Sequence, residues 1–174
     1  SIQSNDPSVI SIANEIVKNC DTDYERALAI HDWVSEYLYY DRDHINSGSA
    51  EALPYSAIEV IASKRAVCLG YATLYASLCR AVNIPCNVVL GYALGVGEDL
   101  QWTDTTVNTD VQNHAWNEVY ADGRWVIVDT TWDSPNVYEN GEFVKGESVS
   151  HIYFDANIDF FSNNHKILEY SRKR

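Results

Sequence analysis

The sequence predicts an α+β fold in which helices come first and an antiparallel β-sheet follows. Apolar residues recur at helical spacing twice before Tyr40 and again from Cys68 to Val82. Later in the chain β-rich runs replace this spacing, and the dipeptide Asp122-Gly123 between two of them is a strong turn signal. This segregation favours helices packed against a sheet.

The first helix is expected to begin at the N-cap Asp6 and the first-turn Pro7. Its apolar stripe is Val9, Ile10, Ala13, Ile16 and Val17. A second helix starts at the capping box of Thr22 and Glu25. Its inward positions are Leu28, Trp33, Val34, Tyr37 and Leu38. His31 lies in this helix, where we expect a packing or surface role.

Residues 40–54 are predicted to form a polar connection. Asp41, Asp43 and Asn46 in this segment allow a calcium-binding interpretation, but their order is not that of an EF-hand, so an ordinary loop is favoured. Ser56 and Glu59 then open a short helix that leads to residue 68.

A third helix is expected to begin at or just before Cys68 and to end before Pro85. Its apolar positions are Leu74, Tyr75, Leu78, Cys79 and Val82. A cysteine in the first turn of a helix faces unpaired backbone N–H groups and the positive end of the helix dipole, which favour the nucleophilic thiolate. Cys68 is therefore a candidate nucleophile, although a cysteine considered alone more often only packs in a core.

The segments Asn113–Tyr120 and Trp125–Thr130 are predicted to form a hairpin. A two-residue loop at Asp122-Gly123 fixes the register by pairing Ala121 with Arg124. Because side chains alternate between the two faces, a shift of one residue would move every side chain to the other face.

This register places His114 and Asp129 on one face of the hairpin. Trp116 would lie opposite Asp129, and His114 opposite Thr131. His114 and Asp129 are then diagonal neighbours about 7–8 Å apart at the backbone, a gap that an imidazole and a carboxylate can bridge. With Cys68 they offer the parts of a Cys-His-Asp nucleophilic site. The alternative is that His114 and Asp129 are ordinary sheet residues without a catalytic role.

Other segments give weaker signals. Asn87–Leu94 is a predicted strand, and Asn140-Gly141 suggests a second hairpin. The polar segment Gly95–Gln112 has no clear periodicity and is expected either to shape access to the site as a loop or to be a surface excursion. The last residues, 171–174, are expected to fray.

Three motifs carry a family resemblance: VCLGYA around Cys68, NHAWNEV around His114 and WVIVDTTWD around Asp129. Together they resemble the motifs of the bacterial transglutaminase-like superfamily, closely over about residues 56–133 and loosely elsewhere. The resemblance implies a papain-like core, with the nucleophile helix packed on an antiparallel β-sheet. It also implies that Cys68 attacks an amide or acyl carbonyl, that His114 moves the proton and that Asp129 orients His114.

The oxyanion hole departs from the papain-like pattern, because Ala62 and Ser63 stand where a polar side chain such as glutamine is usual. The backbone N–H of Cys68 could supply one donor. The candidates for a second donor are the hydroxyl of Tyr55 and the indole N–H of Trp116 or Trp132. The alternative for Tyr55 is a half-buried packing role.

Length and composition limit the remaining possibilities. At 174 residues and 46% hydrophobic, the chain is expected to form one domain over residues 1–174. Since it contains no methionine, we expect a processed protein or part of a longer chain. A formal charge of −13 argues against nucleic-acid binding; it either attracts basic peptides and amines or only maintains solubility. No apolar run is long enough to span a membrane.

The four cysteines show no metal-binding spacing, so neither a metal nor another cofactor is expected. A disulfide between Cys20 and Cys79 or Cys86 is left open. The family resemblance leads us to expect a secreted or cell-surface enzyme that acts on amide or acyl bonds of proteins or peptides through a Cys68 thioester. Transfer to an amine acceptor and hydrolysis share this intermediate. The alternatives are a cysteine peptidase or amidase, and a catalytically silent binding module.

Overall fold

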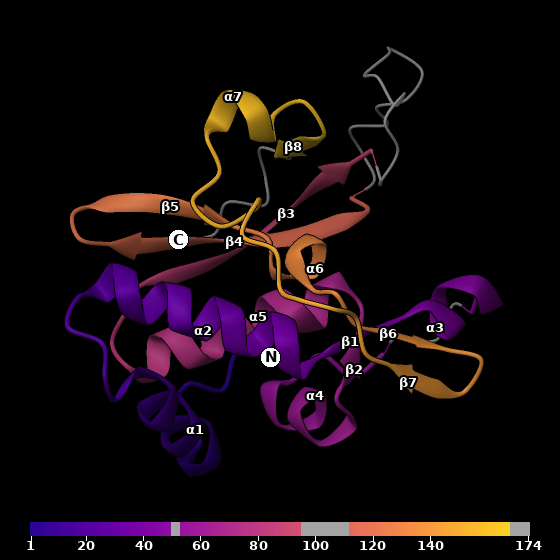
Figure 1. The fold of residues 1–174 in the computed structure, drawn as a ribbon, viewed down its shortest axis with the longest axis horizontal. Helices are drawn as coiled ribbons and strands as arrows, with labels where there is room; N and C mark the ends of the chain where they lie inside the picture. Colours follow the sequence, from indigo (N-terminus) through magenta and orange to yellow (C-terminus); the bar gives the residue numbers. More distant parts are fainter. Residues whose placement is uncertain (50–52, 95–111, 168–174) are drawn as a thin grey trace.

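A computed structural model describes residues 1–49, 53–94 and 112–167. It has two β-sheets with helices packed beside them, so the predicted α+β fold is confirmed (Figure 1). The larger sheet has the strand order β5-β4-β3-β8, and the smaller one has the order β2-β1-β6-β7.

The helical layer lies against one face of the larger sheet (Figure 1). Its helices are α1 (Pro7–Val17), α2 (Asp23–Tyr37), α4 (Ala57–Ser63) and α5 (Cys68–Ala81). The predicted caps are confirmed: the Asp6 side chain accepts from the first-turn backbone, and Thr22 and Glu25 form a reciprocal capping box. These local hydrogen bonds explain why α1 and α2 begin where the sequence predicts.

Helix α5 is the centre of the core. Every residue from Gly70 to Cys79 is buried, because α1, α2 and α4 contact it on one side and β3 and β4 on the other. Gly70 is required for this packing: a Cβ there would approach the Cβ of Ala66 to 2.6 Å. The first turn of α5, which begins with Cys68, is thereby held close to the strand that precedes it.

The larger sheet is formed by β3 (Cys86–Ala93), β4 (His114–Ala121), β5 (Arg124–Val128) and β8 (His165–Ile167). The predicted hairpin register is confirmed from Ala121–Arg124 to Asn117–Val128. It was wrong beyond that point, because the chain leaves the sheet after Val128. Trp116 therefore does not pair with Asp129, nor His114 with Thr131.

The short helix α6 (Thr130–Asp133) explains this early exit. The side chain of Asp129 accepts from the backbone N–H groups of Thr131 and Trp132 and so caps α6. The backbone N–H of Asp129 donates to the carbonyl of Tyr153 in a distant segment. These three bonds take the place of the ladder bonds that a longer β5 would have made.

The smaller sheet is formed by β2 (Arg65–Ala66), β1 (Tyr39–Asp41), β6 (Val137–Glu139) and β7 (Glu142–Val144), and the predicted second hairpin is confirmed in β6 and β7. The loop expected over residues 40–54 was partly wrong, because β1 and α3 (Arg42–Ser47) occupy its first half. The acids there have structural partners: Asp41 caps α3, and Asp43 accepts from two backbone N–H groups in the β6–β7 turn.

The C-terminal part forms α7 (Ile158–Phe161) and β8, two elements that the sequence did not predict. Strand β8 pairs with β3 across more than 70 intervening residues, as Gly91 opposite Ile167 shows. Gly91 makes this close approach possible, since a Cβ there would lie 2.3 Å from both the Lys166 carbonyl oxygen and the Trp116 ring.

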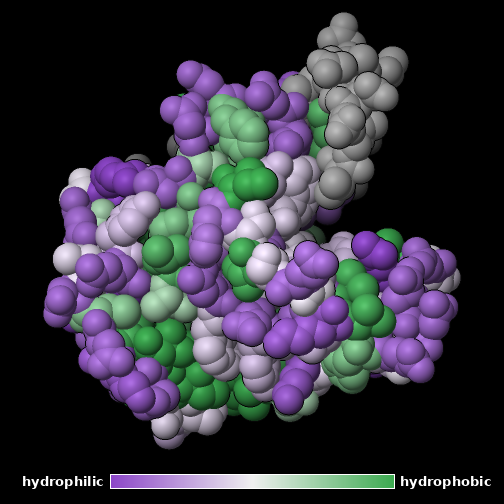
Figure 2. Space-filling model, in the orientation of Figure 1, coloured by the Kyte–Doolittle hydropathy of each residue, from purple (hydrophilic) through white to green (hydrophobic). Residues whose placement is uncertain are grey.

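The face of the molecule seen in Figure 2 is mainly hydrophilic, with hydrophobic patches between hydrophilic residues. No helix in the described ranges is long and apolar enough to cross a bilayer. All four cysteines are free thiols, so the disulfide left open for Cys20 is absent. The expectations for residues 95–111 and 171–174 fall outside the described residues.

Candidate active site

Cys68 is the first residue of α5 and is partly exposed to solvent. The preceding residue, Val67, is extended, and its side chain gives the helix no capping hydrogen bond. The first-turn N–H groups and the helix dipole therefore act on whatever occupies this end of α5. This is the setting that the sequence predicted for a reactive thiol.

His114 and Asp129 form the central contact of the site. The distance between His114 Nε2 and Asp129 Oδ2 is 2.6 Å, His114 is 8% exposed and Asp129 is fully buried. Because Nε2 is engaged by the carboxylate, Nδ1 is the ring nitrogen left to exchange a proton with Cys68. The spatial relation that the hairpin predicted is thus present, although Asp129 reaches it from the cap of α6.

A buried amide fixes the position of α5 relative to His114. The Asn117 side chain, on the same strand as His114, donates to the backbone carbonyl of Ala72 in α5 at 2.9 Å and to that of Asn87 in β3 at 3.1 Å. A buried amide of this kind is costly to leave unpaired, so it resists sliding of the helix along the sheet. Asn117 belongs to the NHAWNEV motif, but its neighbours in the sequence give no signal of its contact with α5.

His165 is a site residue that the sequence analysis missed. Its Nε2 lies 3.1 Å from Asp129 Oδ2, and its ring stacks on Phe161 and contacts Trp132. A lone histidine near the end of a polar segment gives no local signal of this role. Only the pairing of β8 with β3 brings it to Asp129.

The electrostatics of the site keep Asp129 ionised and shift the pKa values of the two neighbouring histidines in opposite directions. Burial disfavours the charged form of His114, but the charge and hydrogen bond of Asp129, together with Cys68, raise the pKa of His114 to about 10. Burial also opposes ionisation of Asp129, but His114 and His165 hold its pKa well below the usual range. The pKa of His165 is lowered, mainly by burial. His114 is thus the charged partner at neutral pH and His165 the neutral one.

The three side chains predicted as donors to the oxyanion do not all lie beside His114. The Trp116 and Trp132 rings both lie beside His114, with centroid distances of 5.9 and 5.8 Å. Tyr55 is 47% exposed, and in the described part of the chain no hydrogen bond or ring contact joins it to the catalytic candidates.

Tyr40 is better placed than Tyr55 and was not considered in the sequence analysis. It lies on β1, next to the strand that leads into Cys68. Burial raises the pKa of Tyr40 to about 12, and the nearby Cys68 and Asp129 act in the same direction. The phenol therefore stays protonated at neutral pH and keeps its O–H as a hydrogen-bond donor.

His114, Asp129 and His165 also present three potential metal-ligand atoms within 4.8 Å of one another. However, Asp129 already accepts four hydrogen bonds, two from histidine rings and two from the backbone of α6. A carboxylate with this set of donors is suited to hold and orient the two imidazoles. The triad accounts for the bond to His114 and the cap of α6 for the two backbone bonds, whereas His165 lies outside the triad.

Comparisons with known proteins agree with this geometry. The model of the transglutaminase-like superfamily matches residues 10–130. Kyphoscoliosis peptidase of Mus musculus is 30% identical over 123 residues, and that of Homo sapiens is 31% identical over the same length. Each alignment covers 71% of this chain but only 18% of the relative, so the chain spans less than a fifth of their length.

Two solved structures share the fold. A candidate cysteine protease from Cytophaga hutchinsonii superposes with a TM-score of 0.55 and 30% identity, over 83% of this chain and 42% of that protein. A structure described as a TGase superposes with a TM-score of 0.51 and 19% identity, over 71% of this chain and 30% of the other. The second likeness shows the fold alone.

Proposed function

Because this chain belongs to the transglutaminase-like superfamily, we propose that it is a thiol enzyme that cleaves amide bonds of proteins or peptides through a thioester on Cys68. The observation that carries the proposal is the 2.6 Å contact between the His114 ring and the buried Asp129, close to a partly exposed thiol at the start of α5. These are the parts that nucleophilic catalysis by cysteine requires.

The proposed reaction has two steps. The Cys68 thiolate attacks the carbonyl carbon, the C–N bond breaks, and the His114 imidazolium gives its proton to the departing amine. Neutral His114 then takes a proton from an incoming water or amine, which attacks the thioester. The C–S bond breaks, an acid or a new amide leaves, and the Cys68 thiolate and the His114 imidazolium are restored. Asp129 stabilises the imidazolium at rest and holds the ring with Nδ1 toward the sulfur.

The oxyanion that forms in each step needs at least two donors. The backbone N–H of Cys68 supplies one, as expected for a residue in the first turn of a helix. We assign the second to the Tyr40 hydroxyl, which lies close enough to Cys68 to be influenced by its charge. Trp132, which also lies beside His114, is the next candidate.

Water is the acceptor that the comparisons favour. The two relatives near 30% identity are named as peptidases, and so is the candidate protease structure at 30% identity. Transfer to an amine is the second candidate, supported by the chemistry that the two reactions share.

A mass-spectrometric activity screen distinguishes the two outcomes. The protein is incubated with a peptide library, with and without a primary amine. Hydrolysis gives shortened or deamidated peptides whether or not the amine is present, whereas transamidation gives products that carry its mass. Absence of any product and of any Cys68-dependent thioester would favour a catalytically silent binding module.

A further inference from the structure

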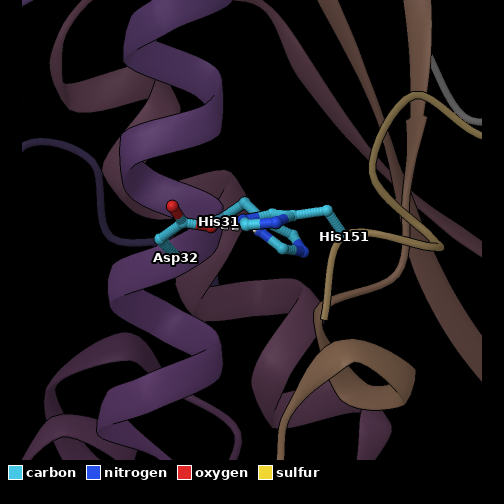
Figure 3. Close-up of side chains that lie close together, drawn as sticks. All are labelled: His31, Asp32 and His151. Carbon is cyan, nitrogen blue, oxygen red and sulfur yellow. Dashed lines mark hydrogen bonds and ion pairs between the residues drawn. The ribbon is translucent and has the colours of Figure 1, made fainter. Parts of the chain in front are cut away.

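A second group of histidine and acidic side chains lies away from Cys68. His31 and Asp32 are neighbours on α2, and His151 comes from the segment that follows β7; the three side chains converge (Figure 3). The distance between His31 Nδ1 and Asp32 Oδ1 is 2.9 Å, and that between His151 Nε2 and the same oxygen is 2.7 Å. Both ring nitrogens therefore meet the same carboxylate oxygen, and the three potential ligand atoms all lie within 4.8 Å of one another.

The buried ring of His31 is oriented so that Nδ1 faces Asp32. Its Nε2 lies 2.9 Å from Asp133 Oδ2, and both side chains are inaccessible to solvent. The carboxylate of Asp133 holds a proton on Nε2. Burial disfavours the charged ring, but the hydrogen bonds to Asp133 and Asp32 raise the pKa of His31, so in the metal-free site Nδ1–H donates to Asp32 and a bound metal ion would replace this proton. A carboxylate bound to the far nitrogen of a histidine is the usual outer partner of a histidine metal ligand.

Asp133 also fixes the segment that carries His151. Its side chain accepts from the backbone N–H of Tyr153, at 3.0 Å for the shorter contact, and its backbone carbonyl accepts from Ser150 at 3.0 Å. The same residue therefore positions one histidine directly and the other through its loop. This arrangement joins elements more than 100 residues apart, so it is not a product of local sequence.

The cluster is open to solvent on one side. The side chains of Asp32 and His151 are 44% and 56% exposed, whereas that of His31 is fully buried. A surface hollow lined by Asp32, Glu36, Pro135 and residues 145–149 gives access from solvent to the Asp32 side of the cluster.

We propose that His31, Asp32 and His151 bind one divalent transition-metal ion of the zinc class, with water in the remaining position. Two imidazoles and one carboxylate form a ligand set suited to zinc. Ligand atoms on a tetrahedral zinc ion are about 3.3 Å apart, as its bond lengths require, so a small outward movement of the two exposed side chains accommodates the ion. The bound ion would tie α2 to the segment after β7 and stabilise the fold.

The test measures zinc binding directly. Equilibrium dialysis with metal analysis is carried out on a Cys68→Ala protein, so that the catalytic thiol contributes no ligand. The site is removed by Asp32→Asn and by His151→Ala; both side chains are exposed enough for the fold to tolerate the change. His44→Ala, on α3 outside the cluster, is the matched control. His165→Ala reports on binding at the other histidine cluster.

We expect one zinc ion per chain, an affinity at least about tenfold weaker in Asp32→Asn and His151→Ala, and no change in His44→Ala. Zinc should also raise the melting temperature of the Cys68→Ala protein but not that of its His151→Ala derivative. The proposal is overturned if no saturable binding occurs, if all variants bind equally, or if His165→Ala is the variant that loses the ion. Because catalysis is not measured, failure of the proposed function would leave this result unchanged.

Discussion

Replacing Asp129 with asparagine should separate the orientation of His114 from the attack by Cys68. In the structure one carboxylate oxygen accepts from two backbone N–H groups of α6, and the other accepts from the two histidine rings. An amide has only one oxygen. If that oxygen caps α6, the NH₂ group faces His114 and favours the tautomer with its proton on Nδ1, which cannot accept the proton of the thiol.

The raised pKa of His114 indicates how large the effect of Asp129→Asn on stability should be. Raising the pKa of His114 from 6.5 to about 10 corresponds to roughly 5 kcal/mol of favourable interaction, shared by Asp129 and Cys68. Since the neutral variant can keep some of its hydrogen bonds, we expect Asp129→Asn to lower the free energy of unfolding by about 2–4 kcal/mol. The rate of thioester formation should fall by roughly 10- to 10,000-fold, with the fold retained.

The assay is the rate at which an activated acyl substrate adds to the protein, followed by intact-mass spectrometry and expressed per folded molecule. Cys68→Ala and His114→Ala should abolish the adduct, because they remove the nucleophile and the proton acceptor. Asp133→Asn is the matched control: it also alters a buried carboxylate of α6 bound to a histidine, but away from Cys68, and should keep the acylation rate. If Asp129→Asn reacted as fast as the unmodified enzyme, Asp129 would be only structural and the triad would reduce to a dyad.

Three further predictions follow from the same contacts. Iodoacetamide at pH 6 should label the partly exposed Cys68 much faster than the buried Cys79, and equal rates of peptide modification by mass spectrometry would contradict an activated thiol. His165→Gln should keep more acylation activity than His165→Ala, because the amide still gives Asp129 a donor; equal rates would show that this bond is unimportant. The raised pKa of His114 means that its stabilising charge is complete below pH 6.5 and is lost as the pH rises through about 10. Urea unfolding should therefore show stability falling over that range, and His114→Gln should flatten the fall.

The sequence alone was sufficient for features that depend on neighbouring residues. The caps of α1 and α2 and the register of the β4–β5 hairpin followed from short-range hydrogen bonds and from the alternation of side chains. Cys68 at the start of α5 followed from helical periodicity. Such features are determined by a few adjacent side chains, so they can be read before the fold is known.

The tertiary structure decided where Asp129 lies and what surrounds it. The strand was expected to continue through Asp129, but the bond to Tyr153 and the cap of α6 take this residue out of the sheet. His165 reaches Asp129 only because β8 pairs with β3, and Tyr40 approaches Cys68 only because β1 pairs with β2. These contacts join segments far apart in the chain, and no periodicity or turn signal specifies which distant segments will pack together.

For the cluster around His31 too, the sequence predicted the local element, and the tertiary structure decided the contacts. The sequence placed His31 correctly in a helix and expected it to pack or lie at the surface, which is what a histidine on such a helix usually does. It is fully buried, and its partners Asp133 and His151 come from segments that follow the sheet hairpin. The fold must close before those side chains meet, because the free energy that brings them together is the burial of the whole core and not any property of the residues beside His31.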